Sequence, residues 1–177
     1  MSESELWIKH LAPLGLKPSA LAGYAAPKQE EATPESLTPL IETETGKVLL
    51  ATRTTCKQWL KLQAAAEAAD ISLIPISAYR SIAYQATLIA NKLAKGEQLT
   101  DILQSVALPG YSEHHTGEAL DLATPGQAVL TEAFEQSAAF AWLSRHAADF
   151  GFYLSYPRNN SAGFVYEPWH WRYHPCL

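Results

Sequence analysis

The sequence predicts an α+β fold in which helices flank a small, mostly antiparallel sheet. The length of 177 residues suits one domain with a sizeable core. Hydrophobic residues make up 47% and charged residues 18%, which excludes a disordered chain. Segments with helical spacing of apolar residues are mixed with short apolar runs, and several connections are too short for the crossovers that parallel strands need.

The first part of the chain, residues 1–47, is expected to form a short helix and an irregular arm. A helical pattern near the N-terminus is interrupted by Pro13 and Gly15. Residues 25–40 contain three prolines among polar residues, so we predict no regular structure there. The compact domain is expected to span residues 48–177.

The compact domain begins with helical and strand patterns in alternation. Residues 52–70 have apolar residues at helical spacing, and Thr52 is a suitable N-cap. Residues 71–77 form a short apolar run with β-branched residues and are predicted to be a buried strand. Ser81 is a capping residue for a second helix that ends at Gly96.

The second half of the domain has the same mixture. A short helix is expected after Thr100, followed by a strand over about residues 117–123. Residues 131–151 predict one long helix, closed by its final glycine. Two last strands are predicted over residues 152–156 and 163–173, with a polar turn between them.

Composition also excludes some partners and locations. The net charge is −5, from 13 basic and 18 acidic residues, and the basic residues do not cluster. We therefore expect no nucleic-acid partner. No apolar run approaches the roughly 20 residues of a membrane span. The N-terminus lacks the apolar run of a secretory signal, so we expect a cytoplasmic location, or a periplasmic one if a leader was removed.

Three polar clusters stand in apolar surroundings and are the candidate functional residues. They are Ser77, Tyr79, Arg80, Ser81 and Gln85; Ser112, His114 and Asp121; and Glu167, His170 and Arg172. An unpaired buried carboxylate is costly, so an aspartate inside an apolar strand needs a partner. The partner of Asp121 is either a metal ion or an arginine, Arg80 or Arg172.

Catalytic zinc typically takes three protein ligands and leaves one position open. His114, Asp121 and His170 would form such a set, from a loop, a strand and a later strand. Gly117 and Ala119 share the strand parity of Asp121, so we expect them to leave room above that face.

Glu167 is the candidate general base. Pro168 cannot donate to a sheet ladder, so the strand should begin after it and leave Glu167 on the bend. A glutamate beside a zinc-activated water is a standard base for peptide hydrolysis. Arg80 would hold a substrate carboxylate or stabilise an oxyanion. The alternative for Glu167 is a weak cross-strand ion pair with Arg172.

These motifs resemble a known family. The segment "SEHHTGEALD" fits S-x-H-x-x-G-x-A-x-D, and "EPWHWR" fits E-x-W-H-x-R. Together with "SAYRSIAYQ" they resemble the VanY or LAS family of zinc D-alanyl-D-alanine carboxypeptidases, which includes vancomycin-resistance dipeptidases and bacterial L,D-carboxypeptidases. The resemblance covers about residues 48–174 and implies the hedgehog/DD-peptidase-like fold.

The resemblance implies a role for each matched residue. It implies zinc ligands at His114, Asp121 and His170, with Glu167 as catalytic base. It implies that Arg80 steadies the scissile carbonyl or the oxyanion. It also implies that Ser112 and Gln85 bind the terminal carboxylate of the substrate, with Tyr79 of "SAYRSIAYQ" as a further substrate contact. His115 is adjacent to a ligand and is expected to point elsewhere.

The implied reaction is removal of a terminal D-alanine from a peptidoglycan stem peptide or muropeptide. A D,D-enzyme cuts pentapeptides that end in D-Ala-D-Ala, whereas an L,D-enzyme cuts tetrapeptides such as L-Ala-D-Glu-mDAP-D-Ala, where mDAP is meso-diaminopimelate. The expected cytoplasmic location favours the L,D-reaction on recycled tetrapeptides. A non-catalytic zinc-containing peptide-binding module and a phage-type endopeptidase are further alternatives.

Overall fold

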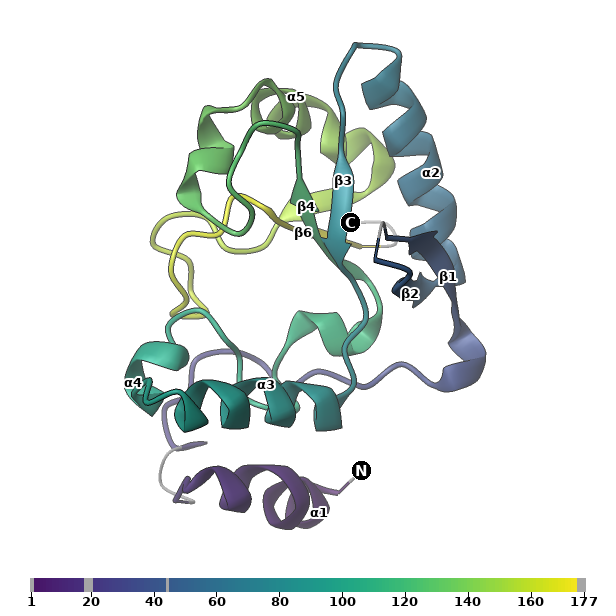
Figure 1. Cartoon of the computed structure of the whole chain (residues 1–177). Coiled ribbons are helices and arrows are strands. Elements are labelled where there is room, and N and C mark those ends of the chain that lie inside the picture. The colour runs from purple at the N-terminus through teal and green to yellow at the C-terminus, as the bar shows by residue number, and fades with distance from the viewer. Residues whose placement is uncertain (1, 18–20, 44, 175–177) are drawn as a thin grey trace.

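The structure is a computed structural model that describes residues 2–17, 21–43 and 45–174. Within these residues the central element is a four-stranded sheet of order β3-β4-β6-β5, in which each neighbouring pair is antiparallel (Figure 1). Its strands are β3 (Ile74–Ser77), β4 (Ala119–Ala123), β5 (Phe152–Leu154) and β6 (His170–Tyr173). The predicted α+β class is confirmed.

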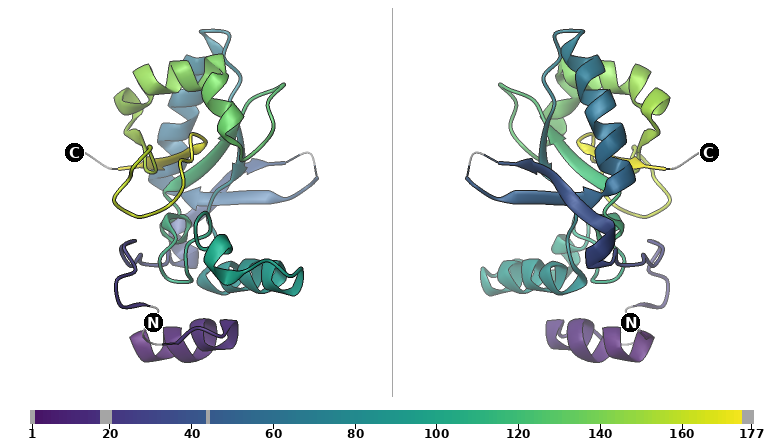
Figure 2. Two further views of the ribbon diagram at one scale, coloured as in Figure 1. Left: turned by 90° about the vertical axis from the view of Figure 1, so that its left-hand side faces the viewer. Right: turned by 90° about the vertical axis from the view of Figure 1, so that its right-hand side faces the viewer.

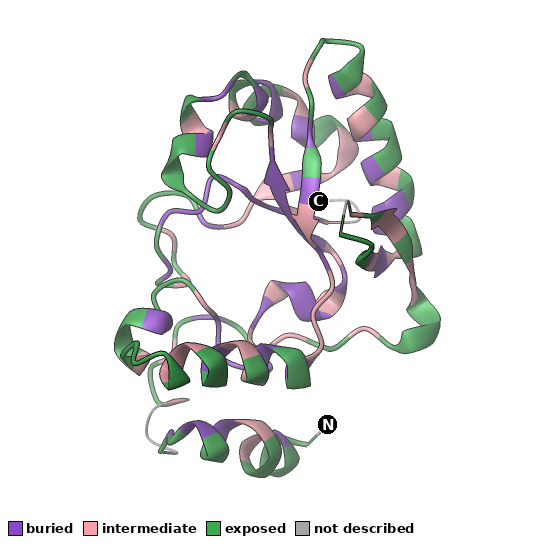
Figure 3. Ribbon diagram, in the orientation of Figure 1, coloured by how far each residue is buried: buried purple, intermediate pink, exposed green. Residues whose placement is uncertain are grey.

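The two faces of the sheet differ in chemistry because strand side chains alternate. Leu120 and Leu122 of β4 and Trp171 of β6 join one buried apolar cluster. Helices α2 (Arg53–Glu67) and α5 (Ala138–His146) contribute to the same cluster, and Figure 3 marks β4 as buried. The core therefore covers one face, and the intervening residues of β4 and β6 point to the opposite face.

Helices α3 (Ile82–Ala94) and α4 (Leu99–Ile102) lie below the sheet in Figure 1, beyond the lower ends of β3 and β4. The N-terminal segment packs on α3 through a separate apolar cluster that includes Leu6, Leu11 and Ile89 (Figure 2). This segment comprises α1 (Glu3–Leu6), a π-helical turn (Trp7–Leu11) and a 3-10 turn (Ala12–Leu14).

The two capping predictions are confirmed. The Thr52 side chain accepts a hydrogen bond from the backbone N–H of Thr55 at the start of α2. The Ser81 side chain accepts one from Tyr84 at the start of α3. Gly96 follows α3 with a φ of +88°, a conformation that glycine adopts without steric cost.

The predicted long helix over residues 131–151 is wrong. The segment is divided into a 3-10 helix (Glu132–Gln136), α5 and a second 3-10 helix (Ala147–Phe150). Ser137 has an extended backbone, with ψ of 153°, and its hydroxyl accepts from Phe140 N–H. A serine that can cap a new helix competes with continuation of the old one.

Two other boundaries also differ from the prediction. Residues 37–42, predicted to be irregular, form β1 (Leu37–Glu42), which pairs with β2 (Val48–Thr52) in an antiparallel hairpin. The expected boundary after residue 47 thus falls inside this hairpin. At the C-terminal end, β6 begins at His170, after Pro168 as predicted, but residues 163–167, which the apolar pattern assigned to the last strand, form no strand.

Among the described residues, no helix has both the length and the apolar character that crossing a membrane requires.

Candidate metal centre

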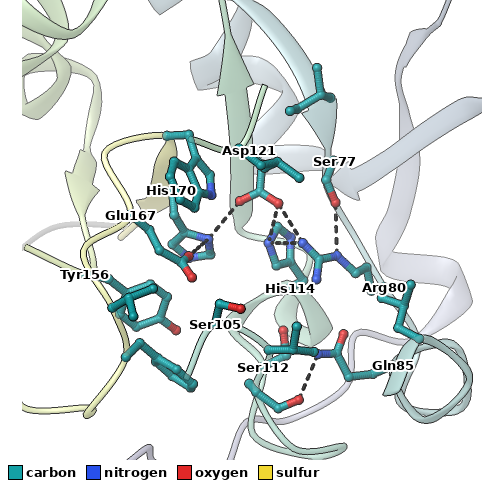
Figure 4. Close-up of a pocket in the computed structure, with 18 of the residues that line it drawn as sticks. Ser77, Arg80, Gln85, Ser105, Ser112, His114, Asp121, Tyr156, Glu167 and His170 are labelled. Atoms are coloured by element: carbon teal, nitrogen blue, oxygen red, sulfur yellow. Dashed lines mark hydrogen bonds and ion pairs between the residues drawn. The ribbon is translucent and has the colours of Figure 1, made fainter. Parts of the chain in front are cut away.

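Three predicted ligands meet on the open face of the sheet. His114 lies in a 3-10 turn (Glu113–Thr116), and Asp121 of β4 is paired in register with His170 of β6. One ligand atom from each residue lies within 4.8 Å of the others. His114 Nε2 is 3.1 Å from Asp121 Oδ2, and His170 Nδ1 is 3.0 Å from Asp121 Oδ1 (Figure 4). All three residues are buried.

The hydrogen bonds of the two histidines suit metal binding. His114 Nδ1 lies 2.7 Å from the carbonyl oxygen of Ala78, which can only accept, so Nδ1 carries the proton and Nε2 is free for a metal. His170 Nε2 donates to Glu113 Oε2 at 2.9 Å, which leaves Nδ1 facing Asp121. Tetrahedral zinc ligands at about 2.1 Å from the ion lie about 3.4 Å apart. The three candidate ligand atoms, one from each residue, lie within 4.8 Å of one another, which is compatible with this spacing. The residues therefore fit a zinc ion.

The three candidate ligands differ in charge in the absence of a metal. Burial alone would raise the pKa of Asp121, but His114, His170 and Arg80 together hold it well below its usual value. Burial lowers the pKa of His114 to about 4, so its imidazole is neutral. Burial also disfavours the charged form of His170, but hydrogen bonds to Asp121 and Glu113 raise its pKa to about 10. A metal at Nδ1 must therefore displace a proton.

Arg80 lies directly against this cluster. Its Nη2 donates to Asp121 Oδ2 at 2.6 Å and lies 2.8 Å from His114 Nε2. Its Nε donates to Ser77 Oγ at 3.0 Å. The Arg80–Asp121 ion pair that the sequence offered as an alternative to metal ligation is thus present. A metal held by these two acceptor atoms would replace the contacts that Arg80 Nη2 makes with them.

The carboxylate of Glu167 lies beside the ligands without joining them. Its Oε2 is 4.0 Å from His170 Nδ1, and the residue is 6% exposed. Burial raises the pKa of Glu167 to about 7, a value at which a carboxylate can both accept and return a proton near neutral pH. Glu167 precedes β6 on the bend, as predicted.

A cavity of about 700 Å³ opens between α3 and this face of the sheet. Besides the three ligands, its wall includes the predicted residues Ser77, Arg80, Gln85, Ser112 and Glu167. Tyr79 is not brought to the wall, since its hydroxyl donates to Glu31 Oε1 at 3.2 Å. The predicted polar clusters thus meet at one cavity, except for Tyr79, Ser81 and Arg172.

His115 and Gly117 make packing and hydrogen-bond contacts away from the candidate ligands. We call the 3-10 turn Glu113–Thr116, which contains His114, the metal turn. His115 points away, as predicted: its Nδ1 donates to the carbonyl of Arg80 and its Nε2 accepts from Gly110 N–H. The prediction that Gly117 leaves room at the cavity is wrong. A Cβ there would lie 2.9 Å from Leu37 Cδ2 and 3.2 Å from Thr52 N, so this glycine permits close packing against the hairpin.

Sequence reasoning missed Glu113, which holds the outer nitrogen of His170. Arg172 pairs with Glu113 at 3.4 Å and with Glu118 at 3.0 Å. The Arg172–Glu167 ion pair that the sequence offered as an alternative is not found among the described residues. Burial would raise the pKa of Glu113, but His170 and Arg172 lower it to about 2, so it stays charged. Glu113 lies between Ser112 and His114 of the motif "SEHHTGEALD", and this position was the one sequence signal that pointed to it.

Two further contributions were also missed. The Tyr156 ring lies 4.7 Å from the His170 ring and lines the cavity. The N-terminal arm supports the metal turn, since Gln29 N–H donates to Gly110 and Ala32 N–H donates to His115, each at 2.8 Å. The arm is therefore part of the scaffold of the site.

We expect Glu113→Ala to weaken zinc binding about 10- to 100-fold, because carboxylates that orient ligating histidines contribute this much to metal affinity. The measurement is competition for zinc with a chromophoric chelator. Glu118→Ala is the matched control, since Glu118 also pairs with Arg172 but does not contact His170. Equal zinc affinities in the two variants would remove Glu113 from this role.

A family model described as D-alanyl-D-alanine carboxypeptidase (VanY) matches residues 49–176. The chain belongs to the VanY family. The predicted resemblance is therefore confirmed, and the matched residues include all three candidate ligands and Glu167.

Other members of the family give the same picture. The chain is 37% identical to the putative carboxypeptidase YodJ of Bacillus subtilis over 62% of its length. It is 37% identical over 66% of its length to VanXYC of Enterococcus gallinarum, a bifunctional D-Ala-D-Ala dipeptidase and carboxypeptidase. It spans only 41% of the first relative and 63% of the second.

Two solved structures share the fold. The LdcB LD-carboxypeptidase superposes with a TM-score of 0.73 at 28% identity, over 84% of this chain and 74% of that chain. A vancomycin-resistance D,D-pentapeptidase VanY in complex with Zn(II) superposes with a TM-score of 0.59 at 25% identity, over 86% of this chain and 80% of that chain.

Proposed function

We propose that this chain is a zinc-dependent carboxypeptidase that removes the C-terminal D-alanine from peptidoglycan stem tetrapeptides, an L,D-carboxypeptidase. The observation that carries the proposal is the placement of the His114, Asp121 and His170 cluster and buried Glu167 on the wall of one cavity. A purely structural metal site has four protein ligands and needs no base. The non-catalytic alternative leaves Glu167 without a purpose.

The protein groups divide the chemistry among them. A bound zinc ion would supply Lewis acidity and lower the pKa of water. Glu167 accepts the proton of the attacking water and returns it to the amino group of the departing D-alanine. Arg80 donates hydrogen bonds to the carbonyl oxygen as negative charge develops there. Burial of these groups strengthens each interaction.

The terminal carboxylate of the substrate needs hydrogen-bond donors. Ser112 supplies a hydroxyl, and Gln85 has a second amide hydrogen beyond the one that it donates to the carbonyl of Ala107. Both residues are buried, at 4% and 0% exposure, and both line the cavity. An interaction with the terminal carboxylate explains why a carboxypeptidase accepts chain ends.

The likeness to the LdcB LD-carboxypeptidase supports the L,D-reaction. The TM-scores as a group do not separate the two reactions, since the L,D-carboxypeptidase DacB scores 0.59 and the D,D-dipeptidase VanXYg 0.64. The similarity to VanXYC favours the D,D-reaction as the second candidate. Action on recycled peptides in the cytoplasm stays a prediction from the sequence.

The test is incubation of the zinc-loaded protein with purified tetrapeptide and pentapeptide, with the products identified by mass. We expect loss of D-alanine from L-Ala-D-Glu-mDAP-D-Ala. Loss of D-alanine from the pentapeptide alone would contradict the L,D-assignment and leave the D,D-carboxypeptidase as the function.

A further inference from the structure

The cavity is longer than a terminal D-alanine requires. Its α3 wall presents Tyr84, Leu88 and Lys92, which are spaced four residues apart and so lie on one face of the helix. A helix rises 1.5 Å per residue, so Lys92 lies about 12 Å along the axis from Tyr84 and farther still from Arg80. The cavity therefore extends from the metal centre along α3, where the upstream part of a peptide would lie.

Two lysines line the α3 side of this cavity. Lys47, in the turn of the β1–β2 hairpin, places its Nζ 5.8 Å from the centre of the Tyr84 ring. Lys92 pairs with Glu97 at 2.9 Å, but both side chains are about 40% exposed, and such surface pairs exchange readily for other partners.

The other charged residues of the cavity wall have partners or belong to the metal centre. Arg80 pairs with Asp121, and Glu132 pairs with Arg158. Glu167 lies beside the ligands. Among the described residues, no ion pair involves Lys47. Lys47 is thus available to a ligand, and Lys92 can exchange its exposed partner Glu97 for one, in a chain whose net charge is −5.

We propose that Lys47 and Lys92 bind free carboxylates of the substrate upstream of the scissile bond, so that the enzyme selects acidic stem peptides over amidated ones. This inference rests on the proposed function and specifies its substrate class. An extended chain covers about 3.3–3.6 Å per residue, so the length of α3 beside the cavity accommodates three or four residues before the terminal D-alanine.

The acidic stem peptide has two such carboxylates. D-Glu is linked through its side chain and leaves its α-carboxylate free, and mDAP has a carboxylate at the end of its side chain. A lysine ammonium binds a carboxylate as a compact point charge and does not require a planar partner. The shared chemistry is therefore a carboxylate held by an ammonium group.

The experiment compares three tetrapeptides: the acidic one, one with the D-Glu α-carboxylate amidated, and one with lysine in place of mDAP. Lys47→Met and Lys92→Met are compared with Lys95→Met, which removes an exposed lysine of the same helix end that does not line the cavity. The values of kcat and KM are measured for each pair. Dissociation constants are measured calorimetrically on the Glu167→Gln background.

We expect each cavity lysine variant to raise KM and Kd about five- to tenfold for the acidic tetrapeptide, with kcat unchanged. The effect should vanish with the peptide that lacks the contacted carboxylate, which identifies the carboxylate that each lysine binds. Lys95→Met should match the wild-type protein.

Equal effects of Lys47→Met and Lys92→Met on all three peptides, or no effect on any, would overturn the inference. Absence of cleavage by the wild-type protein would instead overturn the proposed function. Binding to the Glu167→Gln protein would still decide the role of the lysines in that case, so the two failures are distinguishable.

Discussion

Replacement of Glu167 by glutamine should lower kcat about 10²- to 10⁴-fold, the usual contribution of a general acid–base. Glutamine has nearly the same shape but cannot accept the proton of water. Zinc affinity should stay within about threefold of the wild type, because Glu167 Oε2 lies 4.0 Å from His170 Nδ1 and is not among the ligand atoms. The measurements are D-alanine release and zinc content of the same protein sample.

Glu132→Gln provides a matched control for this result. Glu132 also lines the cavity, but its carboxylate pairs with Arg158 and does not contact the metal centre. We expect it to keep wild-type kcat. Turnover of Glu167→Gln at the wild-type rate would show that another group takes the proton. Glu113 is poorly suited to do so, since its pKa of about 2 makes it a weak base.

Replacement of His114 by alanine should abolish stoichiometric zinc binding and lower activity at least a hundredfold, a larger loss than the 10- to 100-fold cost of removing an orienting partner. Its Nε2 is one of three clustered ligand atoms, so its loss leaves two protein ligands. The measurement is zinc per chain after dialysis at a fixed free zinc concentration, with activity measured in parallel.

The adjacent histidine is the control for the structural cost of this change. His115 is buried like His114. Its ring makes hydrogen bonds with the backbone N–H of Gly110 and the backbone carbonyl of Arg80, and these contacts lie away from the metal centre. His115→Ala should lower the melting temperature but keep one zinc per chain. Loss of zinc from His115→Ala and its retention in His114→Ala would reverse the assignment of the two histidines.

Local signals in the sequence were sufficient for much of the fold. Thr52 and Ser81 cap helices through hydroxyls that contact the backbone three residues later, so short windows contain the whole interaction. Ser137 carried the same signal, but the helical pattern around it masked the break. The β1 strand was missed because Pro39 and the polar residues before it favoured an irregular segment over a hairpin.

The candidate ligands and the candidate base could be selected from the sequence because they lie in two short motifs with fixed spacing. The partners of these residues were not. Glu113 contacts His170 across 57 positions of sequence, and Gln29 contacts Arg172 across 143. No periodicity or spacing encodes such pairs, since they arise when β4 and β6 bring distant segments together. The same limit explains why Arg172 was paired with Glu167 in one sequence hypothesis and lies against Glu113 and Glu118 in the fold.

The most direct test of the central claim is a zinc titration of the metal-depleted protein, with D-alanine release from the tetrapeptide as the readout. If His114, Asp121 and His170 form one catalytic zinc site, activity should rise linearly to a plateau at one zinc per chain. A chelator should then abolish the activity, and added zinc should restore the activity. Full activity in the metal-depleted protein, unchanged by zinc or chelator, would contradict the account.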